Sequence, residues 1–156
     1  MNFKPLMGLL FSAMIVSSCG KEAASGKSLN AAPEKERPAS ERLFHAEAEL
    51  RRAVKSNDTV ALRMVIFQNA DLSLNTYLDD GDTLLTYAIK KKFHLIRNIL
   101  LEKGAFPDLV SLQIDFPGQT PLMIAAHLGD IGAISALLKH DASINYQDSL
   151  GDTALH

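Results

Sequence analysis

The sequence contains a single cysteine, no tryptophan and no large excess of charge of either sign. One cysteine excludes an intrachain disulfide, and no Cys/His cluster marks a zinc site. The formal net charge is −2 over 156 residues, without a basic stripe or a long basic run. This distribution excludes the electrostatic footprint of a nucleic-acid-binding protein. The 47% hydrophobic content is typical of a globular chain with room for one domain and appendages.

No pattern in the sequence predicts a catalytic, metal or nucleotide site. The five histidines lack the partner spacing of a metal site. "GKEAASGKS" resembles a phosphate-binding loop, but Gly20 is one residue too early for that spacing and no strand is expected before it. "YLDDGD" at residues 77–82 does not follow the EF-hand spacing, and it reads as an acidic hairpin tip. We therefore expect a non-enzyme with no cofactor, no metal ion and no small-molecule substrate.

The N-terminal residues have the composition of an export signal. Lys4 precedes an apolar stretch, Leu6 to Val16, that is too short to span a bilayer as a helix. The "VSSC" that ends at Cys19 resembles the lipobox of bacterial lipoproteins. The resemblance implies removal of residues 1–18 and lipidation of Cys19. The alternatives are an ordinary signal peptide with a chance cysteine, or a buried apolar helix.

Residues 19–40 are expected to form the lipidated cysteine and a flexible tether. Gly20, in place of the aspartate associated with inner-membrane retention, favours the periplasmic leaflet of the outer membrane in a Gram-negative host. The tether is rich in Ala, Ser, Lys and Glu, and its only large apolar residue is Leu29. Such a segment cannot bury enough surface to offset the entropy of ordering. The folded domain is predicted to cover residues 41–156.

A repeated motif organises this domain. "GDTLLTYAI" begins at Gly81, "GQTPLMIAA" at Gly118 and "GDTALH" at Gly151, so the numbering gives spacings of 37 and 33 residues. In the clearest copy, Thr120 is expected to cap a helix and Pro121 to occupy its first position. A second helix with apolar residues at helical spacing follows, and turn residues precede the next copy.

A period near 33 with Gly-x-Thr-Pro-Leu resembles the ankyrin repeat. The resemblance implies an all-α ankyrin-repeat solenoid of stacked helix-turn-helix units joined by short hairpin loops, with about three copies and the start of a fourth. The first copy has Ala48 in place of the motif threonine. Leu43, Leu50, Ala53 and Val54 are expected on its buried face, and its charged residues predict a polar N-terminal cap. The fourth copy stops at His156, so we expect a solenoid that is incomplete at its C-terminus, from a fragment or a truncated gene product.

The resemblance also implies a protein partner, bound by the hairpin tips and by the exposed side of each first helix. The matching positions are Asp79, Asp80, Asp82, Lys90, Lys91, Phe116, Gln119, His127, Leu128, Ser149, Leu150 and Asp152. Packing between hairpins is the alternative role for the apolar members of this set. The predicted function is a membrane-tethered periplasmic interaction module. The alternatives are an immunity-type inhibitor of a toxic periplasmic enzyme, or the binding part of a longer enzyme whose catalytic region lies elsewhere.

Overall fold

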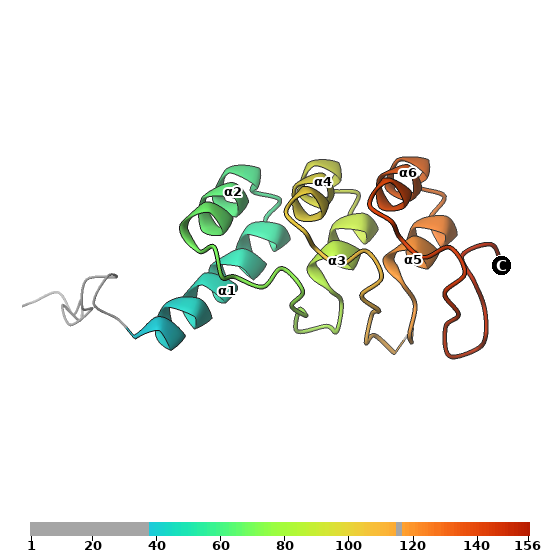
Figure 1. Ribbon diagram of the computed structural model, residues 1–156, viewed down its shortest axis with the longest axis horizontal. Coiled ribbons are helices and arrows are strands. Elements are labelled where there is room, and N and C mark those ends of the chain that lie inside the picture. Colours follow the sequence, from blue (N-terminus) through green and yellow to red (C-terminus); the bar gives the residue numbers. More distant parts are fainter. Residues whose placement is uncertain (1–37, 115–116) are drawn as a thin grey trace, which may run out of the picture. The chain divides into compact units, whose positions relative to one another are not determined.

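The computed structural model describes residues 38–114 and 117–156, in which six helices form three consecutive pairs. The first helices of the pairs lie side by side in an inner layer, and the second helices form an outer layer (Figure 1). The inner helices are α1 (Ala39–Lys55), α3 (Leu84–Lys90) and α5 (Pro121–His127). The outer helices are α2 (Thr59–Gln68), α4 (His94–Glu102) and α6 (Ile131–Lys139). This arrangement confirms the predicted all-α solenoid of helix-turn-helix units.

Threonine caps set where the inner helices begin. Thr83 Oγ1 accepts a hydrogen bond from Thr86 N at 3.0 Å at the start of α3. Thr120 Oγ1 accepts one from Met123 N at 3.3 Å, and Pro121 follows at the first helical position, as predicted. In the first repeat, Ala48 provides no cap. Helix α1 therefore continues toward the N-terminus and has 17 residues, whereas α3 and α5 have seven each.

The core lies between the two layers and between successive repeats. Its largest fully buried apolar side chains are Leu50, Val54, Leu62, Leu84, Ile89, Ile96, Leu100, Ile124 and Leu137. The prediction that Leu43 belongs to this buried face is wrong, because Leu43 lies in the part of α1 that precedes the position of the missing threonine. The shorter helix α3 has no equivalent turn to cover it.

A buried ion pair joins the second repeat to the third. Arg97 Nη1 of α4 lies 3.6 Å from Asp130 Oδ2, and both side chains are buried. Asp130 also caps α6, because its Oδ1 accepts a hydrogen bond from Ala133 N at 2.9 Å. The Asp130 carboxylate therefore caps α6 and also pairs with Arg97 of α4.

The hairpin loops contain little β structure. In the part of the chain that the structure describes, it is limited to an isolated antiparallel bridge between Tyr77 and Thr83. The start of the fourth copy forms a turn, in which His156 N donates to Thr153 O at 3.1 Å. None of the helices within residues 38–114 and 117–156 is long and apolar enough to cross a membrane.

Candidate functional site

The hairpin tips lie along one edge of the solenoid, on the side of the inner helices that faces away from the outer layer (Figure 1). Most of the predicted contact residues are exposed, either at the tips or at the C-terminal ends of α3 and α5: Asp79, Asp80, Lys91, His127, Leu128, Ser149, Leu150 and Asp152. Gln119 and Lys90 are half-buried, and Asp82 is not at the surface as expected. Cys19 and Phe116 lie outside the described residues.

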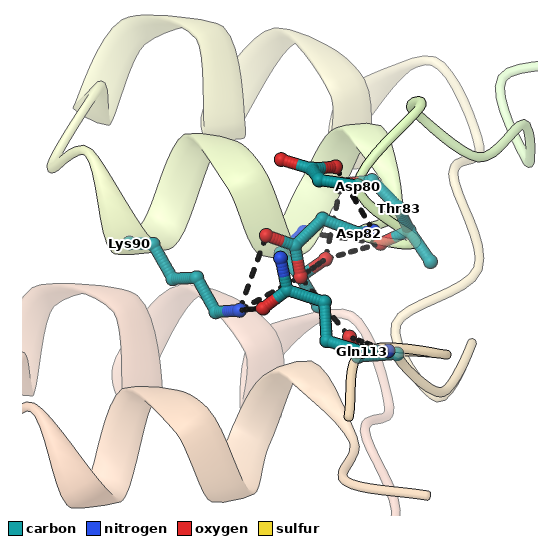
Figure 2. Close-up of polar contacts among 7 residues, drawn as sticks. Asp80, Asp82, Thr83, Lys90 and Gln113 are labelled. Atoms are coloured by element: carbon teal, nitrogen blue, oxygen red, sulfur yellow. Dashed lines mark hydrogen bonds and ion pairs between the residues drawn. The ribbon is translucent and has the colours of Figure 1, made fainter. Parts of the chain in front are cut away.

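Asp82 lies in the interior of the second repeat, with 2% of its surface exposed. Its carboxylate accepts hydrogen bonds from Lys90 Nζ at 2.8 and 3.1 Å and from Ser111 Oγ at 3.0 Å (Figure 2). A buried carboxylate is stable only when it is paired and hydrogen-bonded in this way. The expectation that Asp82 is exposed at a hairpin tip is therefore wrong, because the fold uses its carboxylate internally.

Lys90 is the cation of the same buried cluster. Its side chain is 19% exposed, and its ammonium donates to Gln113 Oε1 as well as to Asp82 (Figure 2). Lys90 is not fully solvated as expected, because Gln113 from the loop before the next repeat accepts a hydrogen bond from its ammonium. Lys91, the next residue, is exposed as expected, and its Nζ lies 5.8 Å from the centre of the Tyr87 ring.

Asp79 is exposed at the first hairpin tip and forms an ion pair with the first repeat. Lys55 Nζ at the end of α1 donates to Asp79 Oδ2 at 2.8 Å. This hydrogen bond lowers the pKa of Asp79, and it raises the pKa of Lys55. Both groups are solvated, so we expect added salt to weaken their attraction.

The second and third tips carry an apolar row. Leu112, Ile114 and Leu150 are 64%, 94% and 81% exposed. The two tips are neighbours, because Ser149 Oγ donates to Pro117 O at 3.1 Å. Leu150 was predicted from the sequence, whereas Leu112 and Ile114 were not. Their signal is the alternation of apolar and polar residues in "SLQI", a pattern that predicts apolar side chains on one side of an extended segment.

This geometry suits contact with another macromolecule. Large exposed apolar side chains surrounded by polar ones are the composition of a protein interface. Within residues 38–114 and 117–156, no group of three or more His, Cys, Asp or Glu side chains is placed to hold a metal ion.

Comparison with known proteins identifies the repeat. Residues 98–156 match the family model of ankyrin repeats (3 copies). The chain is also similar to an ankyrin repeat protein of Acanthamoeba polyphaga mimivirus, with 31% identity over 107 residues. The matched segment is 69% of this chain and 13% of the viral protein, so the chain spans a small part of its relative. The match of residues 98–156 and the three stacked helix pairs together support an all-α, ankyrin-like solenoid.

Proposed function

We propose that this chain is a membrane-tethered protein-binding module of the bacterial cell envelope. The observation that carries the proposal is the apolar row of Leu112, Ile114 and Leu150 on two adjacent hairpin tips. Ankyrin repeats generally mediate protein–protein interaction, so the expected occupant of this row is a protein. No catalytic step is assigned to the module.

The surroundings of the row support a protein contact. Ser149 and Asp152 are exposed beside Leu150 at the third tip. His127 and Leu128 are exposed at the end of α5, on the adjoining inner layer. An apolar centre with a polar rim is the usual organisation of a protein interface. We expect the apolar tips to supply most of the affinity, and the rim to supply selectivity.

The membrane tether rests on the sequence alone. The "VSSC" that ends at Cys19 supports acylation of the cysteine, and Gly20 favours the periplasmic leaflet of the outer membrane. The tether would hold the binding surface in the periplasm, close to the membrane. Replacing Cys19 with serine should release the chain from the membrane fraction and abolish acyl labelling. An unchanged membrane fraction and acyl label in the variant would contradict the lipid anchor.

The partner contact is tested by photocrosslinking in intact cells that express the full chain. A crosslinker at position 152 should give a defined protein adduct in the wild-type chain. Ile114→Asp and Leu150→Asp should each reduce that adduct strongly, whereas Phe44→Asp, at an exposed apolar position on α1, should preserve it. Thermal melts of all the variants check that the fold is retained. Equal adduct in every variant would show that the tips do not bind the partner.

A further inference from the structure

Helix α2 is apolar on both of its sides. Seven of the ten residues in "TVALRMVIFQ" are apolar, and two of them, Leu62 and Val65, are buried in the core. Val60, Met64 and Phe67 are instead 71%, 53% and 87% exposed. Their spacing of four and three residues places them along one exposed face of the helix. A helix that is apolar all round is normally covered on all sides.

Stacking explains the exposure of Met64 but not that of Phe67. Met64 matches Ile99 of the second repeat, which is buried, and Met64 belongs to the first repeat that the structure describes. Phe67 matches Glu102 in α4 and Lys139 in α6, and both of these residues are exposed. The solenoid therefore places a charged side chain at this position in its other repeats. The exposure of Phe67 is therefore not a consequence of its position in the stack.

Basic side chains flank this apolar face. Arg63, Met64, Ile66, Phe67 and Lys103 line an open hollow of about 500 Å³. Helix α2 contains no acidic residue, although Asp58 caps its start and Glu102 precedes Lys103 at the end of α4. Exposed Phe and Met side chains beside Arg and Lys match the composition of helices that lie in the interface of anionic membranes.

Two other occupants of this face are disfavoured. The predicted tether has only Leu29 as a large apolar residue, so it cannot cover Val60, Met64 and Phe67 together. A second copy of the chain, packed face to face, would bring Arg63 and Lys103 against like charges.

The outer helices α2, α4 and α6 lie side by side in one layer (Figure 1). Val60, Leu95 and Ile131 are exposed near their N-termini. We propose that this layer binds the surface of a bilayer that contains anionic lipid, and that the side chain of Phe67 inserts into its interface. The proposal rests on the proposed lipid anchor, because the 20 residue steps from Cys19 to Ala39 would keep the start of α1 within about 70 Å of the membrane even when fully extended.

The test uses the absence of tryptophan from the sequence. The full chain with Cys19→Ser, which cannot be acylated, receives one tryptophan by Phe67→Trp, or by Leu150→Trp on a hairpin tip as the matched control. Both chains are mixed with vesicles of brominated phosphatidylcholine and phosphatidylglycerol. Because both chains retain the same N-terminal segment, any binding by that segment affects the two equally. We expect bilayer contact to quench the Phe67→Trp fluorescence by about twofold and the Leu150→Trp fluorescence much less.

Charge variants test the role of the cations. Arg63→Glu with Lys103→Glu should abolish the quenching at position 67, and Lys139→Glu on α6 should leave most of it. Equal quenching at positions 67 and 150, or no quenching at position 67, would overturn the proposal. Quenching at position 67 that is unchanged by Arg63→Glu with Lys103→Glu would also overturn it. If vesicles do not quench and a photocrosslinker at position 67 captures a protein in cells, the face binds a protein instead. Failure of the anchor appears separately, as an acyl label that Cys19→Ser leaves unchanged, because binding through α2 adds no acyl label.

Discussion

Lys90 Nζ donates hydrogen bonds to both carboxylate oxygens of Asp82, at 2.8 and 3.1 Å, and the pair spans helix α3 from its last residue to the residue before its N-cap. Ser111 and Gln113, from the loop before the third repeat, complete the cluster. The third repeat has Gln119 and His127 at the matching positions, so it cannot form the same carboxylate–ammonium pair. The second repeat therefore has an ion pair of its own, to which the loop before the third repeat is hydrogen-bonded.

Replacing Asp82 with alanine should destabilise the fold although no apolar contact is lost. The change removes the acceptor of Lys90 and Ser111, and leaving such partners unsatisfied costs about 1–3 kcal/mol. Urea melts of the wild-type and variant chains measure the loss. Asp79→Ala, at a solvated carboxylate of the same hairpin, is the control and should unfold at nearly the same urea concentration as the wild type. Equal loss from both substitutions would show that the buried pair has no special role.

The third repeat should respond to changes in core volume on both of its helices. Leu137→Ala removes a fully buried side chain, and cavity formation there costs about 2–5 kcal/mol. Ala125→Leu overpacks the buried face of α5, at a cost of about 1–3 kcal/mol. Leu138→Ala, at a partly exposed neighbour, should cost less than Leu137→Ala. Denaturant melts in which Leu138→Ala is the more damaging substitution would mean that the buried face of α6 has been assigned incorrectly.

The fold was predictable because its signals are local. Thr120 and Pro121 lie next to each other in the sequence and by themselves specify a helix start. Apolar residues at helical spacing specify the buried faces, as Leu137 shows. Leu43 was misassigned because its burial depends on the length of a neighbouring helix, which no residue near Leu43 encodes.

The candidate site was harder to predict because its contacts are distant in the sequence. Asp82 is buried by Ser111, which lies 29 residues later in a loop that is longer than its counterpart in the next repeat. No pattern around Asp82 distinguishes it from the exposed Asp79 and Asp80. Leu112 and Ile114 were predictable in principle, because their alternation is visible in the sequence.

The Lys55–Asp79 pair should appear in a pH titration. The hydrogen bond from Lys55 lowers the pKa of Asp79. The contribution of Asp79 to folding stability is therefore present above the ordinary aspartate pKa, and it is lost as pH falls through the pKa of the folded state. The same hydrogen bond raises the pKa of Lys55. The contribution of Lys55 to folding stability is therefore present below the ordinary lysine pKa, and it is lost as pH rises through the pKa of the folded state.

NMR titration of the Asp79 carboxyl carbon tests this pair. The pKa of Asp79 should rise toward its ordinary value in Lys55→Met, and it should also rise when salt is added to the wild-type chain. Arg52→Met, another cation near the end of α1, is the control and should leave the pKa of Asp79 almost unchanged. An Asp79 pKa that does not respond to the loss of Lys55 would show that the ion pair is not populated in solution.

Alanine substitutions at two glycines distinguish the effect of backbone strain on stability from the effect of a close contact. Gly81 and Gly104 have φ angles of +83° and +90°, so alanine is strained at both positions, by about 1–2 kcal/mol. A Cβ at Gly81 would also lie 3.2 Å from Leu112 C and 3.3 Å from Gln113 N, whereas a Cβ at Gly104 would have no neighbour within 4 Å. Gly81→Ala should therefore lower the melting temperature more than Gly104→Ala. Equal melting temperatures would mean that the loop around Leu112 relaxes without cost.

The contact between Arg97 and Asp130 should couple the second and third repeats energetically. Arg97→Met leaves the carboxylate of Asp130 buried without its cation, while Asp130→Asn keeps a side chain that can cap α6. A double-mutant cycle separates the ion pair from these other roles, and a contact of this kind should give a coupling energy of about 1–3 kcal/mol. Stacked repeats are stabilised by the interfaces between neighbours, so breaking the pair should also broaden the unfolding transition as the third repeat opens first. Hydrogen exchange measured on α6 and on α2 distinguishes local opening from global unfolding. If the single substitutions add without coupling and protection falls equally in both helices, stacking of the apolar core alone joins the two repeats.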